Sequence, residues 1–199
     1  GDVTTKSLRQ VVTATNDGGT FEMGSTVKST FTWSFSKLPT SLTVGGETIT
    51  PTQTGTTEEQ AFTASSQTSK SFKISGVYAG TYGDEKVEKT WTYNFRNKRF
   101  WGCKDAPEAI DSSFIKSLSS EFATAKSKTF NLNDKTDTRY VWYAYPKRFG
   151  KASFSMGGFA GGFEDVITVS FTNNQGFTED YYVYRSTNPG VGYLEVVVK

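Results

Sequence analysis

Few side chains in this sequence could carry out catalysis. The chain of 199 residues contains no histidine and a single cysteine, Cys103. Histidine is the side chain that most often transfers protons near neutral pH, so its absence removes the usual catalytic triads and the ordinary Cys/His zinc sites. A lone cysteine cannot form a disulfide within the chain, and in a Trp-Gly-Cys context it is more often a small buried residue than a nucleophile. We expect Cys103 to be structural.

The paired carboxylates give no positive sign of an active site. Glu58 and Glu59 lie in a polar stretch, and Glu164 and Asp165 follow a glycine-rich one. Glycoside hydrolysis needs two carboxyl groups at a defined separation in space, which sequence spacing cannot show in a β-rich chain. We interpret both pairs as solvated loop charges. The sequence therefore predicts a protein that is not an enzyme and that needs no cofactor.

One cluster of oxygen ligands could hold a calcium ion. It consists of Asn131, Asn133, Asp134 and Asp137. The spacing differs from that of an EF-hand loop, and the glycine and the final glutamate of that loop are missing. A turn in which Asx side chains bond to the backbone explains the cluster more simply. We therefore predict no metal site and keep calcium as the alternative.

A glycine-rich stretch, Gly157–Phe163, is the best candidate for a recognition loop. Glycines let backbone amides approach an anion, but this stretch lacks the Lys-Ser/Thr ending of a phosphate loop and is not followed by a helical pattern. We expect a flexible loop between strands. Phe159 and Phe163 then have two interpretations: their rings fold back onto the domain, which is the commoner outcome, or they contact a glycan or protein ligand.

Charge and hydropathy argue against nucleic acid and membranes as partners. The net charge is +2, and the densest basic group, Arg96, Lys98, Arg99 and Lys104, is typical of a solvated strand and turn. No apolar run is long enough to span a bilayer, and the N-terminus lacks the sections of a signal peptide. We expect a soluble chain, and its start at Gly1 in place of Met is compatible with a piece of a larger protein.

Alternating apolar and polar residues predict β-strands in the first half. Residues 27–36 and 87–95 each place aromatic side chains on one parity, so Trp33, Trp91 and Tyr93 are expected in the core. Further strands are expected at 41–44, 47–50 and 72–78, with a glycine turn at 45–46 and a loop or edge strand at 51–69.

The second half has a different pattern after a Gly- and Pro-containing junction at 102–109. Apolar residues recur every four positions beyond it and predict a short helix near 111–122. Tyr140–Tyr145 is apolar on both parities, which indicates a strand covered on both faces. Other strands are expected at 152–156, 166–171, 181–184 and 193–198. The sequence predicts an all-β chain of two consecutive immunoglobulin-like β-sandwich domains, residues 1–102 and 103–199, the second opened by the helix.

Three stretches of the chain resemble the distal modules of bacteriophage tail-fibre and baseplate proteins. Residues 32–46 (TWSFSKLPTSLTVGG) are similar to a strand, Lys-x-Pro-Thr-Ser turn and glycine hairpin of that family. Residues 93–102 (YNFRNKRFWG) look like its Phe-x-Asn-x-x-Tyr-Tyr-Gly strand end, with Phe100 and Trp101 in place of the tyrosines. The third stretch comprises 143–150 (YAYPKRFG) and 182–186 (YVYRS).

The resemblance implies a fold and a setting but no active-site residue, because these motifs belong to β architecture. It implies a virion component, in a tail fibre or baseplate, with a structural or host-attachment role. Its partners would be other virion proteins, further copies of the chain in a homo-oligomer, and a host-surface glycan or protein. The alternatives are a cell-surface adhesin or carbohydrate-binding module and, with less support, a polysaccharide-degrading enzyme.

Overall fold

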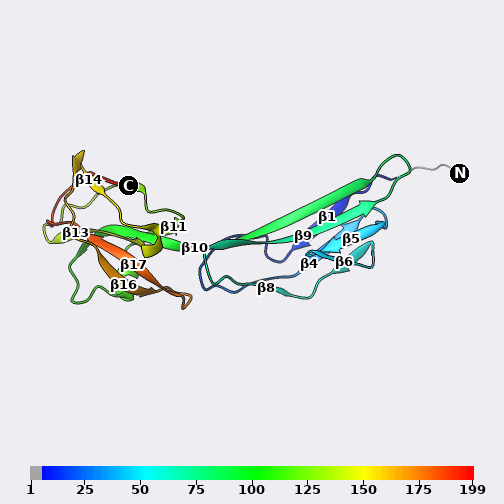
Figure 1. The fold of residues 1–199 in the computed structure, drawn as a ribbon, viewed down its shortest axis with the longest axis horizontal. Coiled ribbons are helices and arrows are strands. Elements are labelled where there is room, and N and C mark those ends of the chain that lie inside the picture. Colours follow the sequence, from blue (N-terminus) through cyan, green and yellow to red (C-terminus); the bar gives the residue numbers. More distant parts are fainter. Residues whose placement is uncertain (1–5) are drawn as a thin grey trace. The chain divides into compact units, whose positions relative to one another are not determined.

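The computed structural model describes residues 6–199, which are almost entirely β-strands and connecting turns (Figure 1). The prediction of an all-β chain is confirmed. The first nine strands are β1 (Gln10–Ala14), β2 (Gly19–Glu22), β3 (Val27–Ser29), β4 (Phe31–Phe35), β5 (Ser41–Val44), β6 (Glu47–Ile49), β7 (Thr54–Thr56), β8 (Gln60–Phe62) and β9 (Thr68–Tyr78). The tenth strand, β10 (Glu85–Asp105), is the longest of the described chain.

The remaining elements follow β10. They are α1 (Ser112–Lys116), β11 (Ser119–Ala123), β12 (Lys128–Asn131), β13 (Arg139–Pro146), a 3-10 turn at Lys147–Phe149, β14 (Phe154–Met156), β15 (Phe159–Ala160), β16 (Ile167–Thr172), β17 (Thr178–Arg185) and β18 (Glu195–Val198).

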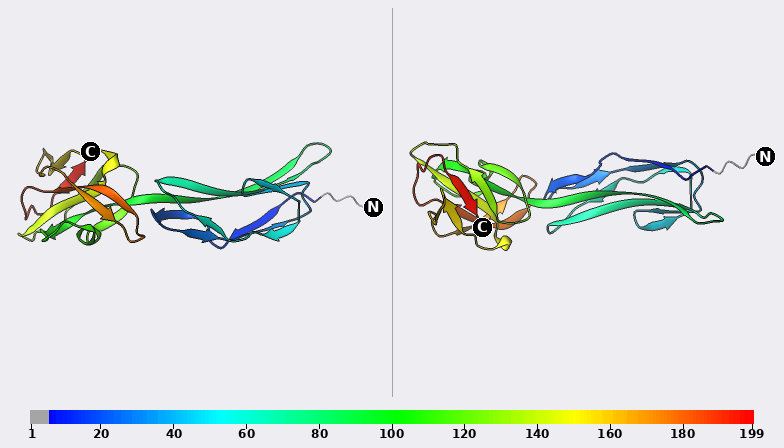
Figure 2. Two further views of the ribbon diagram at one scale, coloured as in Figure 1. Left: turned by 60° about the horizontal axis from the view of Figure 1, so that its bottom comes forward. Right: turned by 90° about the horizontal axis from the view of Figure 1, so that it is seen from above.

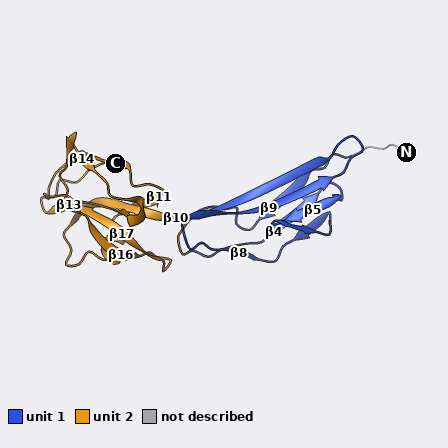
Figure 3. Cartoon of the chain, in the orientation of Figure 1, with its two compact units in different colours: residues 1–21, 25–95 blue, residues 22–24, 96–199 orange. Residues whose placement is uncertain are grey.

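The chain forms two compact units that divide within β10 (Figure 3). Unit 1 contains residues 1–21 and 25–95, and unit 2 contains residues 22–24 and 96–199. The boundary predicted at 102–109 lies later than this division, and its first residues are still strand. Gly102–Asp105 pair with β13, so they belong to the sheet of unit 2 and are not a linker.

Unit 1 is built from facing sheets because its strands alternate buried and exposed residues. One sheet has the order β1-β4-β7, another contains β9, β5, β6 and the first half of β10, and β3 pairs with β8 in a two-stranded sheet. Both views of Figure 2 show the blue strands in a layer separate from the long green pair β9–β10. Phe31 of β4 stacks on Phe72 of β9 at a centroid distance of 3.9 Å. Trp33, Trp91 and Tyr93 are buried, as predicted.

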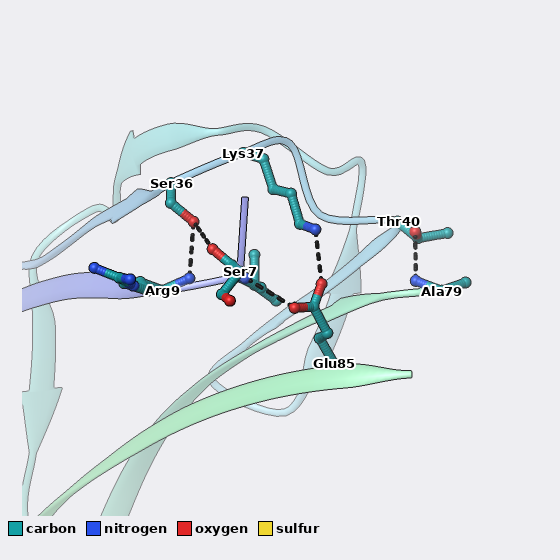
Figure 4. A network of polar contacts seen from close by, with 8 residues as sticks. Ser7, Arg9, Ser36, Lys37, Thr40, Ala79 and Glu85 are labelled. Carbon is teal, nitrogen blue, oxygen red and sulfur yellow. Dashed lines mark hydrogen bonds and ion pairs between the residues drawn. The ribbon is translucent and has the colours of Figure 1, made fainter. Parts of the chain in front are cut away.

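A polar network joins three segments at one end of unit 1 (Figure 4). The Glu85 carboxylate accepts the amide hydrogen of Leu8 at 3.2 Å and forms an ion pair with Lys37 Nζ at 2.7 Å. Ser36 Oγ accepts the Arg9 amide hydrogen at 2.8 Å. The bond from Lys37, followed by that from Leu8, lowers the pKa of Glu85. The N-terminal strand is thereby tied to the start of β10.

Unit 2 has a main sheet that is covered on both faces. The sheet contains β16, β17, β13 and the second half of β10, with β11 also paired to β10. A smaller sheet of order β12-β18-β14-β15 packs on one face, and the segment of α1 packs on the other. β13 is buried at six consecutive positions from Val141 to Pro146, which confirms the prediction of a strand covered on both faces.

The predicted helix near 111–122 is shorter in the structure. Asp111 caps it by accepting the Phe114 amide hydrogen at 2.9 Å, and α1 ends at Lys116. Residues 119–123 form β11, which pairs with 97–101 of β10. The helical spacing of apolar residues is overridden because strand β10 offers backbone partners to this segment.

Residues 22–24 are an integral part of unit 2. Met23 is fully buried; its amide donates to the Arg96 carbonyl at 2.9 Å, and its carbonyl accepts from Asn173 Nδ2 at 2.7 Å. Glu22 forms an ion pair with Lys98 at 3.4 Å. Unit 2 therefore requires a segment that lies more than seventy residues upstream of the rest of its chain.

Candidate functional site

The glycine-rich stretch of unit 2 forms a β-hairpin and not the predicted flexible loop. Met156 of β14 pairs with Phe159 of β15 across Gly157 and Gly158. These glycines have φ angles of 57° and 84°, as a tight two-residue hairpin turn requires. The sequence had turn residues but too short an apolar pattern to predict the second strand, which is only two residues long.

The structure separates the two phenylalanines of this stretch. Phe159 is 81% exposed next to the turn. Phe163 is half-buried and stacks on Phe154 at a centroid distance of 4.1 Å, and its backbone bridges to Ser186. Of the two interpretations given to these residues, folding back onto the domain describes Phe163, and presentation to solvent describes Phe159.

An open groove of about 680 Å³ lies beside the hairpin. Phe163 and Phe154, whose rings stack on each other, both line the groove. Glu164 and Asp165 supply carboxylates, and Lys151 supplies a cation. A groove with aromatic lining residues and a few polar groups is typical of a site for a polar ligand with an apolar face, such as a saccharide.

The two carboxylates of the groove differ in their contacts. Glu164 forms an ion pair with Arg185 at 3.3 Å, and its amide donates to the Arg185 carbonyl at 2.9 Å. Asp165 is exposed, and within residues 6–199 no ion pair or hydrogen bond engages its side chain. Asp165 is thus the carboxylate available to accept hydrogen bonds from a ligand.

Tyr184, which also lines the groove, is held in place together with a second tyrosine, Tyr145. Tyr184 Oη accepts the Ala152 amide hydrogen at 2.9 Å and lies 3.5 Å from Tyr145 Oη, which donates to the Gly150 carbonyl at 2.6 Å. Burial raises the pKa of Tyr145, so this hydroxyl stays protonated as a donor. Because both rings are anchored in the core, the backbone at 150–152 is held in place before any ligand binds.

The cluster predicted as a turn or calcium site is engaged in local contacts. Asp134 Oδ1 accepts the Thr136 amide hydrogen at 2.8 Å, and Oδ2 pairs with Arg139 at 2.6 Å. These bonds lower the pKa of Asp134 to about 2. Within residues 6–199, no group of three or more His, Cys, Asp or Glu side chains has the geometry to hold a metal ion.

Cys103 is partly buried, and two of the basic residues near it, Lys98 and Arg99, form ion pairs within the chain. Cys103 is half-buried on β10, and burial raises the pKa of its thiol, which lowers its reactivity. Arg99 pairs with Glu121 at 3.1 Å, and Lys98 pairs with Glu22. None of the helices in residues 6–199 is long and apolar enough to cross a membrane.

The sequence did not bring the lining residues of the groove together. Tyr184 lies in a strand, as predicted, and Glu164 and Asp165 are exposed, as expected of solvated charges. Local patterns could not join them, because the groove forms only when β14 and β17 are both folded against the same core. Comparison with protein-family models, curated proteins and solved structures finds no match to this chain.

Proposed function

We propose that this chain is a non-enzymatic component of a bacteriophage virion, part of a tail fibre or baseplate, with a structural role and a role in host attachment. Its two units would be variants of the immunoglobulin-like β-sandwich. Its partners would be other virion proteins and a host-surface glycan or protein. The resemblance of residues 32–46, 93–102 and 143–150 to tail modules supports the virion setting, since these stretches fall in both units.

The observation that carries the attachment role is the exposed ring of Phe159 on a hairpin whose next residues, Ala160 and Gly161, line a groove together with Phe163. Large aromatic side chains are costly to leave in water, and one presented by a rigid hairpin is a common recognition device. The groove adds Asp165, a hydrogen-bond acceptor without an internal partner. A saccharide presents apolar ring faces and hydroxyl donors, which are the two features that this site would contact.

Adsorption to host cells tests the proposal. Phe159→Ala is expected to reduce adsorption several-fold with an unchanged melting temperature, because the ring is exposed and supports no core packing. Tyr82→Ala removes an even more exposed aromatic from unit 1 and is the matched control. Unchanged adsorption of the Phe159 variant, or an equal loss in the control, would place the receptor site elsewhere.

Phe163→Ala tests whether this ring contacts the receptor, stabilises the fold, or does both. Its ring stacks on Phe154, so this variant is expected to lower the melting temperature as well as adsorption. If Phe163→Ala reduces adsorption and leaves the melting temperature unchanged, the stack of Phe163 on Phe154 does not stabilise the fold.

The groove also supports a second function, that of a cell-surface adhesin or carbohydrate-binding module. Aromatic lining residues beside a free carboxylate would serve such a module equally well. Glycan-array binding without turnover is expected for both functions, and labelling of purified particles with an antibody against the chain distinguishes them. Release of oligosaccharides from a bound polysaccharide would contradict both and establish an enzyme.

A further inference from the structure

Strand β16 forms one edge of the main sheet of unit 2. The sheet runs β16-β17-β13-β10, so β16 pairs with β17 on one side only. The strand is six residues long, Ile167-Thr-Val-Ser-Phe-Thr172. An edge of this kind presents backbone donors and acceptors to whatever lies beside it.

The hydrogen-bond pattern shows which amides face outward. In an antiparallel pair, residues alternate between pairs that exchange hydrogen bonds and pairs that do not. The Asn173 amide donates to the Phe177 carbonyl at 2.9 Å, which sets Phe171 and Val169 as the bonded positions against β17. Thr168, Ser170 and Thr172 therefore direct their backbone groups away from β17.

Only one end of this outward row is covered. The Thr172 amide donates to Ser112 Oγ of α1 at 3.0 Å. Within residues 6–199, no backbone or side-chain partner engages the outward amides of Thr168 and Ser170. The open edge is thus the stretch Ile167–Ser170.

The open edge lacks the features by which proteins block edge strands. β16 contains no charged residue and no proline, and its Ile, Thr and Val residues favour strand pairing. Ile167 is 42% exposed. The edge strands β6 and β12 differ, since each begins with a charged residue, Glu47 and Lys128.

We propose that β16 pairs antiparallel with β16 of a second copy of this chain, about a two-fold axis at Val169. Thr168 of each copy then lies opposite Ser170 of the other, and both residues use their outward backbone groups. Val169 lies opposite Val169 of the second copy. Self-pairing places related residues of one strand against each other, and the neutrality of β16 means that no like charges meet. The main sheets of the two copies become continuous.

The length of the open edge sets the strength of the pairing. The ladder ends where α1 takes the Thr172 amide, so the contact is far smaller than the roughly 1,200 Å² of a stable specific complex. Association of the isolated chain is therefore expected at high protein concentration, and it becomes stronger where copies are held close together in a larger assembly.

Disulfide trapping tests the register in the full 199-residue chain. In this register Val169 faces its own counterpart as a non-bonded antiparallel pair, whose Cβ atoms lie about 4.5–5.5 Å apart, close enough for a disulfide after a small shift. Val169→Cys in a Cys103→Ser background is expected to give a covalent dimer on mild oxidation. Thr168→Cys in the same background is the control, because this residue faces Ser170 of the second copy and not itself.

Proline substitution tests the same edge without cysteine chemistry. Ser170→Pro removes an amide hydrogen that has no partner within the chain, so the melting temperature is expected to change little while concentration-dependent association in sedimentation velocity is lost. Ser170→Ala keeps the amide and should still associate. A chain that stays monomeric at every concentration, or equal cross-linking at 168 and 169, would overturn the proposal and leave a strand of another protein as the occupant of this edge.

Discussion

Replacing Asn173 with alanine is expected to destabilise unit 2 by about 2–4 kcal/mol. The side chain is buried, and it joins residues 22–24 to the turn between β16 and β17. Its Nδ2 donates to the buried Met23 carbonyl at 2.7 Å, and its Oδ1 accepts the amide hydrogens of Gln175 and Phe177 at 2.9 and 3.0 Å. The buried carbonyl left without a donor costs about 1–3 kcal/mol, and each of the two amides, which belong to residues that are at least partly exposed, costs about 0.5 kcal/mol.

Native-state hydrogen exchange measures this loss where it occurs. Each unit holds two of the four tryptophans, so a fluorescence melt of the whole chain mixes the two units, whereas the amides of β16 and β17 report on unit 2 alone. The free energy of unfolding derived from the slowest of these amides should be lower by about 2–4 kcal/mol in the variant. Asn174→Ala, at the exposed neighbouring position, is the matched control. A change below about 0.5 kcal/mol in the Asn173 variant, the size of an ordinary surface effect, would refute the reasoning.

Three further outcomes follow from the same structure. Trp91→Ala should cost about 3–5 kcal/mol in a urea melt, because the ring is 3% exposed; a loss under about 1 kcal/mol would contradict its burial. A fragment of residues 103–199 should not fold, because it lacks the β10 strand that carries Phe100 and pairs with β11 and β13, whereas 1–102 retains all of unit 1; proton NMR of both fragments would decide. Glu85→Gln should lower stability at neutral pH. The pKa of Glu85 is lowered by Lys37, so its contribution is present above the unfolded pKa of about 4.3 and is lost as the pH falls through the folded value. The difference in melting temperature between Glu85→Gln and wild type should therefore become smaller in acid. Glu47→Gln, at an exposed position, is the control and should show no such trend.

The strands of this fold were predictable wherever one face is buried and the other is solvated. Phe31, Trp33 and Phe35 alternate with polar residues, and the structure buries all three. The length of β10 could not be predicted, because its pattern changes parity between the two units. The buried residues of β10 occupy odd positions from Trp91 to Asn97, and the next buried residue, Phe100, is at an even position. Asn97 is also polar, so it does not look like a core residue. A strand that changes its buried face in this way looks like the end of one strand and the start of a loop.

The candidate site was predictable only as a set of separate pieces. Phe159 and Phe163 stood out because glycines surround them, but the difference between them depends on Phe154, which covers one ring and not the other. The contribution of Met23 to unit 2 had no local signal at all. A buried methionine in a short, glycine-flanked segment fits many packing sites, and only the pairing of its backbone with Arg96 and Asn173 fixes which one it occupies.

The proposed groove and the proposed edge pairing compensate for each other's weakness. An open groove with one free carboxylate makes few contacts, so a single copy is expected to bind a saccharide weakly. The Ile167–Ser170 edge is also short, so it holds two copies together only at high protein concentration. If copies are concentrated in a particle, as proposed, pairing through β16 would place two grooves in one assembly, and a ligand array on a cell surface would then meet both. Binding through both grooves converts the second contact into an intramolecular step, which raises the overall affinity by orders of magnitude without any new contact in either groove.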